Sequence, residues 1–217
     1  IKVLGSLISI LSLRINSETP KNQVSFNHGI ASGDPTNTNV IIWSKLTVNT
    51  KSSIRVNWEV AIDKSFNIII NKGTVLALKS KDHTIKKDVY VGAKYNGLPL
   101  FYRFNVGQIY SPVGQTLTLP SNNPSNFKIA FCSCSNYPAG FFNAYESIAD
   151  DKSIDLVLHL GDYIYEYDEN GYATEDSKRL GRVVNPKHEI VSLKDYRLRH
   201  AQYKTDKQLK KLHSLKP

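Results

Sequence analysis

Apolar and polar residues alternate in short runs over residues 24–120, and this pattern predicts β-strands. The runs have the two-residue period of a half-buried strand, without the 3.6-residue period of an amphipathic helix. They are "NVIIWSKL" (39–46), "IRVNWEVAID" (54–63), "DHTIKKDVYV" (82–91) and "LFYRFNVG" (100–107). Between them stand the turn signals "SGDP" (32–35), "NKG" (71–73), "YNG" (95–97) and "SPVG" (111–114). Regularly spaced short strands predict an antiparallel β-sandwich of the immunoglobulin or fibronectin type.

Large aromatic residues within these runs are expected to pack the sandwich. We assign Trp43, Trp58 and Tyr102 to its core or sheet faces, in preference to a ligand platform. The composition changes at "PSNNPSN" (120–126), where Pro, Ser and Asn replace the alternating pattern. Such a segment is typical of a linker, which we place at 121–126.

The pattern after the linker predicts a second unit, over residues 127–217, with parallel strands. "FKIAFCS" (127–133) and "IDLVLHLGD" (154–162) are continuous apolar runs typical of buried strands, and "GFFNAYESIADD" (140–151) has helical spacing. A strand, a helix and a second strand form a right-handed crossover, so both strands end at the same edge of the sheet. Chemistry in open α/β sheets lies outside that edge.

Three candidate metal ligands follow these two strands. Cys134 comes just after the first strand, Asp162 just after the second, and Tyr165 three residues later. A thiolate, a carboxylate and a phenolate suit trivalent iron, and spare carboxylate lone pairs suit calcium. The alternative is that Gly161-Asp162 only closes the strand as a turn while the tyrosine packs. His159, inside the strand, is expected to pack or to support a ligand.

The two cysteines and the net charge exclude few of the possible functions. Cys132 and Cys134 stand two apart, which in a strand separates their Cα atoms by about 6.6 Å with parallel side chains, so no mutual disulfide is expected. Burial as small apolar residues is the alternative to metal binding. The chain has 217 residues, 41% hydrophobic, and a net charge of +9. Its lysines are scattered, which favours a solvated basic surface over a nucleic-acid interface.

The first residues resemble an export signal. Lys2 precedes the apolar run "VLGSLISILSL" (3–13), and the chain becomes polar at residue 14. The run is too short to span a bilayer comfortably, so no stable membrane span is expected. We assign 1–23 as a signal-like segment, with a buried first helix or strand as the alternative.

Longer stretches of the chain resemble the alkaline phosphatase D (PhoD-like) family. The resemblance covers nearly everything from Phe26 onward. Its N-terminal sandwich is similar to "FNHGIASGDPTNTNVIIWSKL", "WEVAIDKSFNIIINKGTV" and "FYRFNVGQIYSPVGQTLTLP". The opening of its metallophosphoesterase domain is similar to "IAFCSCSNYPAGFFNAYESIADDKSIDLVLHLGDYIYEY" and "VVNPKHEIVSLKDYRLRHAQYKTDKQLKKLH".

The resemblance implies a metal site and a reaction. The family's metal ligands are the Cys of an S-C-Q segment, the Asp of G-D-Y and the Tyr three residues later, which fall on Cys134, Asp162 and Tyr165. Asp162 would be the catalytic carboxylate shared between ferric iron and calcium. Ser135 stands where the family usually has Gln. The family's later ligands, in a D-D-H-E segment and downstream histidines, do not occur before Pro217, so the resemblance implies an incomplete catalytic domain over 127–217.

Three functions follow from these observations. The first is an exported alkaline phosphatase or phosphodiesterase acting on phosphate esters, present here as an N-terminal portion that a downstream fragment would complete. The second is an inactive remnant that serves as a binding or structural module. The third is a nucleic-acid binder centred on "YKTDKQLKKLHSLKP" (203–217), which ranks last because that segment is typical of a solvated helix face. We therefore expect no specific nucleic-acid binding.

Overall fold

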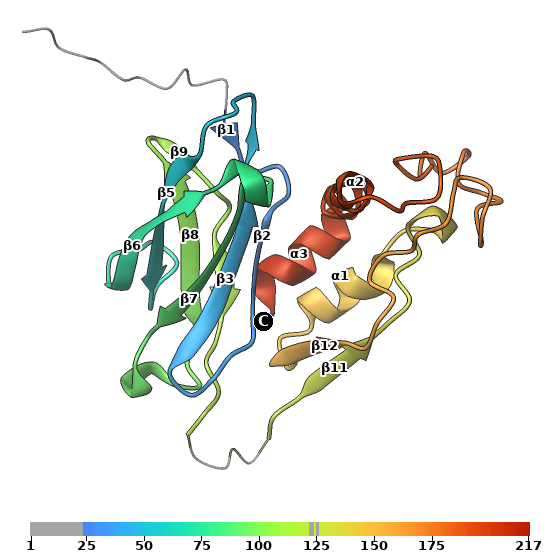
Figure 1. The fold of residues 1–217 in the computed structure, drawn as a ribbon. Coiled ribbons are helices and arrows are strands. Elements are labelled where there is room, and N and C mark those ends of the chain that lie inside the picture. The colour runs from blue at the N-terminus through green and yellow to red at the C-terminus, as the bar shows by residue number, and fades with distance from the viewer. Residues whose placement is uncertain (1–23, 122–123, 125) are drawn as a thin grey trace, which may run out of the picture.

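Two antiparallel sheets face each other in the first part of the protein (Figure 1). The computed structural model describes residues 24–121, 124 and 126–217, so the signal-like segment 1–23 and part of the linker lie outside the described residues. One sheet has the order β2-β3-β7, and the other has the order β10-β8-β5-β6 with β9 beside β8. The strands are β1 (Val24–Ser25), β2 (Ile30–Gly33), β3 (Asn39–Lys45), β4 (Thr47–Val48), β5 (Ile54–Ala61), β6 (Ile69–Ala77), β7 (Thr84–Tyr90), β8 (Leu100–Val106), β9 (Ile109–Tyr110) and β10 (Gly114–Thr116).

The alternating pattern buries one face of the central strands between the sheets. Alternate residues of β3 and β5 are buried, as a two-residue period requires. The resulting core includes Ile42, Trp58 and Tyr102, so the expectation of a sandwich-like first part is met and the latter two aromatics pack inside it. Trp43 lies on the other face of β3, where its ring meets His200 edge-on at a centroid distance of 6.1 Å.

The turn predicted at residues 71–73 is wrong, because these residues lie inside β6. Gly73 is paired with Trp58 of β5 across the sheet. A side chain at this glycine would place its Cβ only 2.7 Å from an indole carbon of Trp58. The glycine is therefore present because the indole occupies its side-chain space, and no turn is required there.

The second part contains the predicted strand, helix and strand. β11 (Ile129–Cys132) and β12 (Leu156–His159) are parallel neighbours, and α1 (Asn143–Asp150) connects them. The helix begins later than its spacing suggests, since Phe141 and Phe142 precede it. α2 (Leu193–Tyr203) and α3 (Lys207–Leu215) follow. In the ranges that the structure describes, every helix falls short of the length and apolar character needed to cross a bilayer.

α3 lies between the sandwich and α1, and it joins the two parts (Figure 1). Leu209 and Leu212 are buried in a second core with aromatic residues of the α1 region. On its other side, Lys210 donates a hydrogen bond to Asn27 O at 3.2 Å. Lys211 forms ion pairs with Glu146 and Asp150 of α1. Most of the segment that the nucleic-acid hypothesis invokes is thus the amphipathic helix α3, and these two lysines make contacts within the protein.

Candidate metal centre

Two loops at the carboxyl ends of β11 and β12 carry the residues that the sequence singles out. The last residues of the two strands are paired, so both loops leave the sheet at the same edge. Backbone hydrogen bonds join the loops to each other. Cys134 N donates to Gly161 O at 3.1 Å, and Ser135 N donates to Asp162 O at 2.8 Å. The hydrogen bonding between the two parallel strands therefore continues into the loops that follow them.

The backbone of both loops is in the left-handed region at the candidate ligands. Cys134 has φ 59°, and Asp162 has φ 53° directly after Gly161 at φ 126°. Residues with a side chain adopt such angles at a cost of about 1–3 kcal/mol, and they keep them only where surrounding contacts hold them. Glycine has no such cost, which explains Gly161 in the sharp turn out of β12.

The loops bring the three predicted ligands together around one carboxylate oxygen. The Cys134 thiol lies 3.6 Å from Asp162 Oδ2. The Tyr165 hydroxyl donates to the same oxygen at 3.1 Å. The described residues contain no group of three His, Cys, Asp or Glu side chains arranged for a metal. This cluster supplies two such residues, and its third donor is a tyrosine.

The chemistry of the three donors fits a ferric ion. A thiol, a carboxylate and a phenol already share one point in space, and their deprotonated forms are the ligand types expected for trivalent iron. Partial burial, together with hydrogen bonds to Cys134 and Asp162, raises the pKa of the Tyr165 phenol well above its ordinary value. The phenol therefore keeps its proton at neutral pH unless a cation takes the place of that proton.

Arg199 of α2 holds the segment that carries Tyr165. Its guanidinium is almost fully buried, with 1% of the residue exposed, and it donates to the carbonyl oxygens of Tyr165 and Tyr167. It also donates to the carbonyls of Asn185 and Pro186. Burial lowers its pKa. The sequence carries no signal for this role, because the partners are backbone atoms of distant segments.

Other basic residues near these loops have structural contacts. In the sequence, Arg182, Lys187 and Arg197 are possible phosphate contacts, but each is expected to lie on a helix or loop surface. That interpretation is wrong for Arg182, which is buried and forms an ion pair with Asp206 at 2.8 Å. Arg197 donates to Ser80 O at 2.7 Å, while Lys187 remains exposed.

A cluster of polar side chains lies beneath the loops. The His159 imidazole is within hydrogen-bonding distance of the Ser135 hydroxyl, at 2.9 Å, and of the Tyr145 hydroxyl, at 3.0 Å. The two hydroxyls also contact each other. Burial lowers the pKa of His159 and raises that of Tyr145. His159 thus supports the loops from inside the sheet, as its position in the strand predicts.

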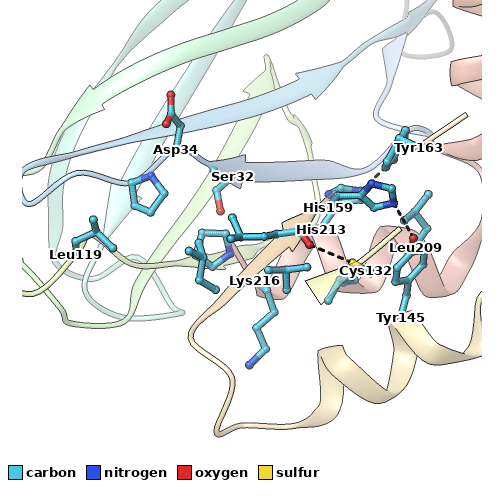
Figure 2. Close-up of a pocket in the computed structure, with 17 residues that line it drawn as sticks. Ser32, Asp34, Leu119, Cys132, Tyr145, His159, Tyr163, Leu209, His213 and Lys216 are labelled. Carbon is cyan, nitrogen blue, oxygen red and sulfur yellow. Dashed lines mark hydrogen bonds between the residues drawn. The ribbon is translucent and has the colours of Figure 1, made fainter. Parts of the chain in front are cut away.

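Two hollows adjoin this region. A cavity of about 430 Å³ lies between β12, α3 and residues 32–35 of the sandwich, and Tyr145, His159 and His213 line it (Figure 2). It does not include the three candidate ligands. A second hollow, of about 380 Å³, is lined by Cys134 and Ser135 together with the start of α1. Of the three candidate ligands, Cys134 is in the lining of this second hollow.

Comparisons with known proteins match most of the described region. The profile of the PhoD-like phosphatase family matches residues 129–217, and that of its N-terminal domain matches residues 12–120. Alkaline phosphatase D of Bacillus subtilis (strain 168) is 38% identical over 219 residues, covering 96% of this chain and 36% of the relative. The solved structure of PhoD has a TM-score of 0.82 and 38% identity, covering 90% of this chain and 38% of that chain. This chain therefore spans little more than a third of those relatives, and it belongs to the PhoD-like phosphatase family.

Proposed function

We propose that this protein takes part in the hydrolysis of phosphate esters, as an alkaline phosphatase or phosphodiesterase, at an iron and calcium site built on Cys134, Asp162 and Tyr165. The observation that carries the proposal is the shared point at Asp162 Oδ2, where a thiol and a phenol both meet the carboxylate. Membership of the PhoD-like phosphatase family supports the reaction class. The matched relatives extend well beyond this chain, so the activity of the whole enzyme is a proposal here.

Each residue has a distinct role in this proposal. Cys134 and Tyr165 would hold ferric iron through their sulfur and phenolate oxygen, and Asp162 would be shared between iron and calcium. When bound, such metals supply Lewis acidity toward phosphoryl oxygens and lower the pKa of water. The chain itself orients the ligands: the bonded loops fix Cys134 against Asp162, and Arg199 anchors the backbone of Tyr165.

Iron titration tests the ligand assignment directly. With the downstream part of the catalytic domain supplied, added ferric iron should produce the visible absorption of a phenolate bound to iron. Tyr165→Phe should remove that band while leaving the fold intact, because only the hydroxyl is lost. Equal band intensity in the variant would show that another tyrosine is the ligand.

The two cysteines provide a matched comparison. Cys134→Ser should weaken iron binding much more than Cys132→Ser. The Cys132 thiol lies within β11 and points to Leu158 O at 3.8 Å, whereas the Cys134 thiol meets Asp162. Equal loss of iron from both variants would contradict the assignment.

A non-catalytic role as a binding module is the second candidate. The three donors come from only two strand ends, and a metal pair that contacts both the attacking and the leaving oxygen takes ligands from more sides. We therefore expect no appreciable turnover of a chromogenic phosphate monoester or diester by this chain with iron and calcium added. Metal-dependent turnover that Asp162→Ala abolishes would instead establish a working site within it.

Export is the last element of the proposal. It is supported by the apolar run at residues 3–13 and the polar stretch that follows. A fusion of residues 1–26 to a reporter that is active only outside the cytoplasm should give signal. A fusion with two of the apolar residues in the run replaced by Arg should not. Equal signal from both fusions would exclude this segment as the export signal.

A further inference from the structure

Three polar side chains from separate elements meet beneath the two ligand loops. Ser135 belongs to the loop after β11, Tyr145 to α1 and His159 to the end of β12. Ser135 and Tyr145 are 3% and 6% exposed, so their hydroxyls form this contact away from bulk water. The His159 Nε2 atom lies 2.9 Å from Ser135 Oγ and 3.0 Å from Tyr145 Oη (Figure 2 shows the latter contact).

The cluster is bonded to the backbone of both loops. Ser135 directly follows Cys134, and its own N–H donates to Asp162 O at 2.8 Å. On the other side, the Gly161 N–H donates to His159 Nδ1 at 3.4 Å. Since Nδ1 accepts a hydrogen bond, Nε2 carries the imidazole proton and faces the two hydroxyls. One side of the imidazole therefore holds the Asp162 loop, and the other side holds the Cys134 loop.

Both loops need contacts that hold their backbone in place, because each contains a residue with a side chain in the left-handed conformation, which is unfavourable by itself. Cys134 and Asp162 have φ near 55°, and neither is a glycine. If either residue relaxed to an ordinary backbone conformation, its side chain would leave the shared point at Asp162 Oδ2. The backbone hydrogen bonds between the loops and the contacts that the loops make with neighbouring elements oppose that relaxation.

We propose that Ser135, Tyr145 and His159 form a positioning network that holds Cys134 and Asp162 in the conformations that bring their donor atoms together. The inference rests on the proposed metal centre for its consequence in metal binding. Its structural content, the immobilisation of the two loops, is independent of any metal. The three residues act through the backbone of the two loops.

Amide hydrogen exchange of the metal-free protein tests the immobilisation. The Cys134 and Ser135 amides report on the bonds that join the loops. Ser135→Ala and His159→Gln should speed their exchange by roughly two- to ten-fold, the effect of one lost hydrogen bond. His159→Gln retains a polar atom near the Nε2 position while losing the acceptor for Gly161. His159→Asn retains that acceptor, and it should restore part of the protection of Gly161.

Two controls separate positioning from general stability. Ser147→Ala removes a hydroxyl from the exposed side of α1, where it bonds only to Asn143 O, and it should change nothing in the loops. Amides of β3 and β5 in the sandwich should exchange at unchanged rates in the Ser135 and His159 variants. If loop exchange stays unchanged, or rises in proportion to exchange throughout the second part, the network is only core packing and the proposal fails.

Iron binding supplies the second measurement. Ser135→Ala and His159→Gln should weaken ferric iron binding by roughly two- to ten-fold and shift the phenolate absorption, although all three ligands remain. Unchanged affinity and absorption in a protein that binds iron would overturn the positioning role. If the unaltered protein binds no iron even with the downstream part of the catalytic domain supplied, the proposed function fails, and amide exchange alone still decides whether the network immobilises the loops.

Discussion

Replacement of Lys204 by methionine should stabilise the protein at neutral and mildly acidic pH. Lys204 follows the last turn of α2 and is 4% exposed, with its ammonium 4.7 Å from the ring centroid of Trp43 on β3. Burial lowers its pKa to about 7 from the ordinary 10.5. The neighbouring His200 adds no second positive charge at neutral pH, since its own pKa is lowered to about 4, chiefly by burial.

The magnitude follows from this pKa. A fall from 10.5 to about 7 corresponds to roughly 5 kcal/mol against the charged form in the folded state. The cation–π contact with Trp43 offsets about 0.5–2 kcal/mol of this desolvation cost. Methionine keeps most of the aliphatic chain in place, so Lys204→Met should raise the free energy of unfolding by roughly 3 kcal/mol at pH 6.

The pH dependence has a definite sign. The unfolded chain binds the lysine proton up to pH 10.5 and the folded chain only up to about 7, so the unaltered protein gains stability as pH rises between these values. The advantage of Lys204→Met should therefore shrink from pH 7 upward and disappear above pH 10.5. Urea unfolding at pH 6, 8 and 10 measures this, with Lys207→Met, an exposed lysine of α3, as control. A variant less stable at pH 6, or an advantage independent of pH, would refute the desolvation argument.

Three further predictions concern glycines and the sandwich. Gly161→Ala meets no atom within 4 Å, so its cost of about 1–2 kcal/mol should be purely backbone strain, measured by urea unfolding; a variant of unchanged stability would contradict this. Gly73→Ala places a methyl group 2.7 Å from an indole carbon of Trp58 and should lower stability by about 1–3 kcal/mol in thermal unfolding; an unchanged transition would show that the indole moves freely. A fragment of residues 24–120 should unfold cooperatively by itself, because its core is separate from the second core; a transition without cooperativity would reject the predicted domain boundary.

The local pattern of the sequence determined the elements and the edge where the candidate site lies. The period of two predicts strands such as β3 and β5, and the order of strand, helix and strand predicts the parallel pair. Cys134 and Asp162 follow from that topology, since parallel strands end together. Tyr165 follows as a third donor one turn further along, and the family resemblance supports the same three residues. Each of these inferences depends only on residues close together in the chain.

The tertiary structure decided what depends on distant segments. The local sequence around Gly73 predicts a turn, but Trp58 of the neighbouring strand occupies the space of a side chain there. Arg199 anchors the backbone of Tyr165 because α2 places its guanidinium against carbonyl oxygens that are distant from it in the sequence. Lys204 looked like any other basic residue, yet Trp43 and the surrounding core remove it from water. Periodicity records which face of an element is buried, whereas desolvation and hydrogen-bond partners are set by what packs against that face.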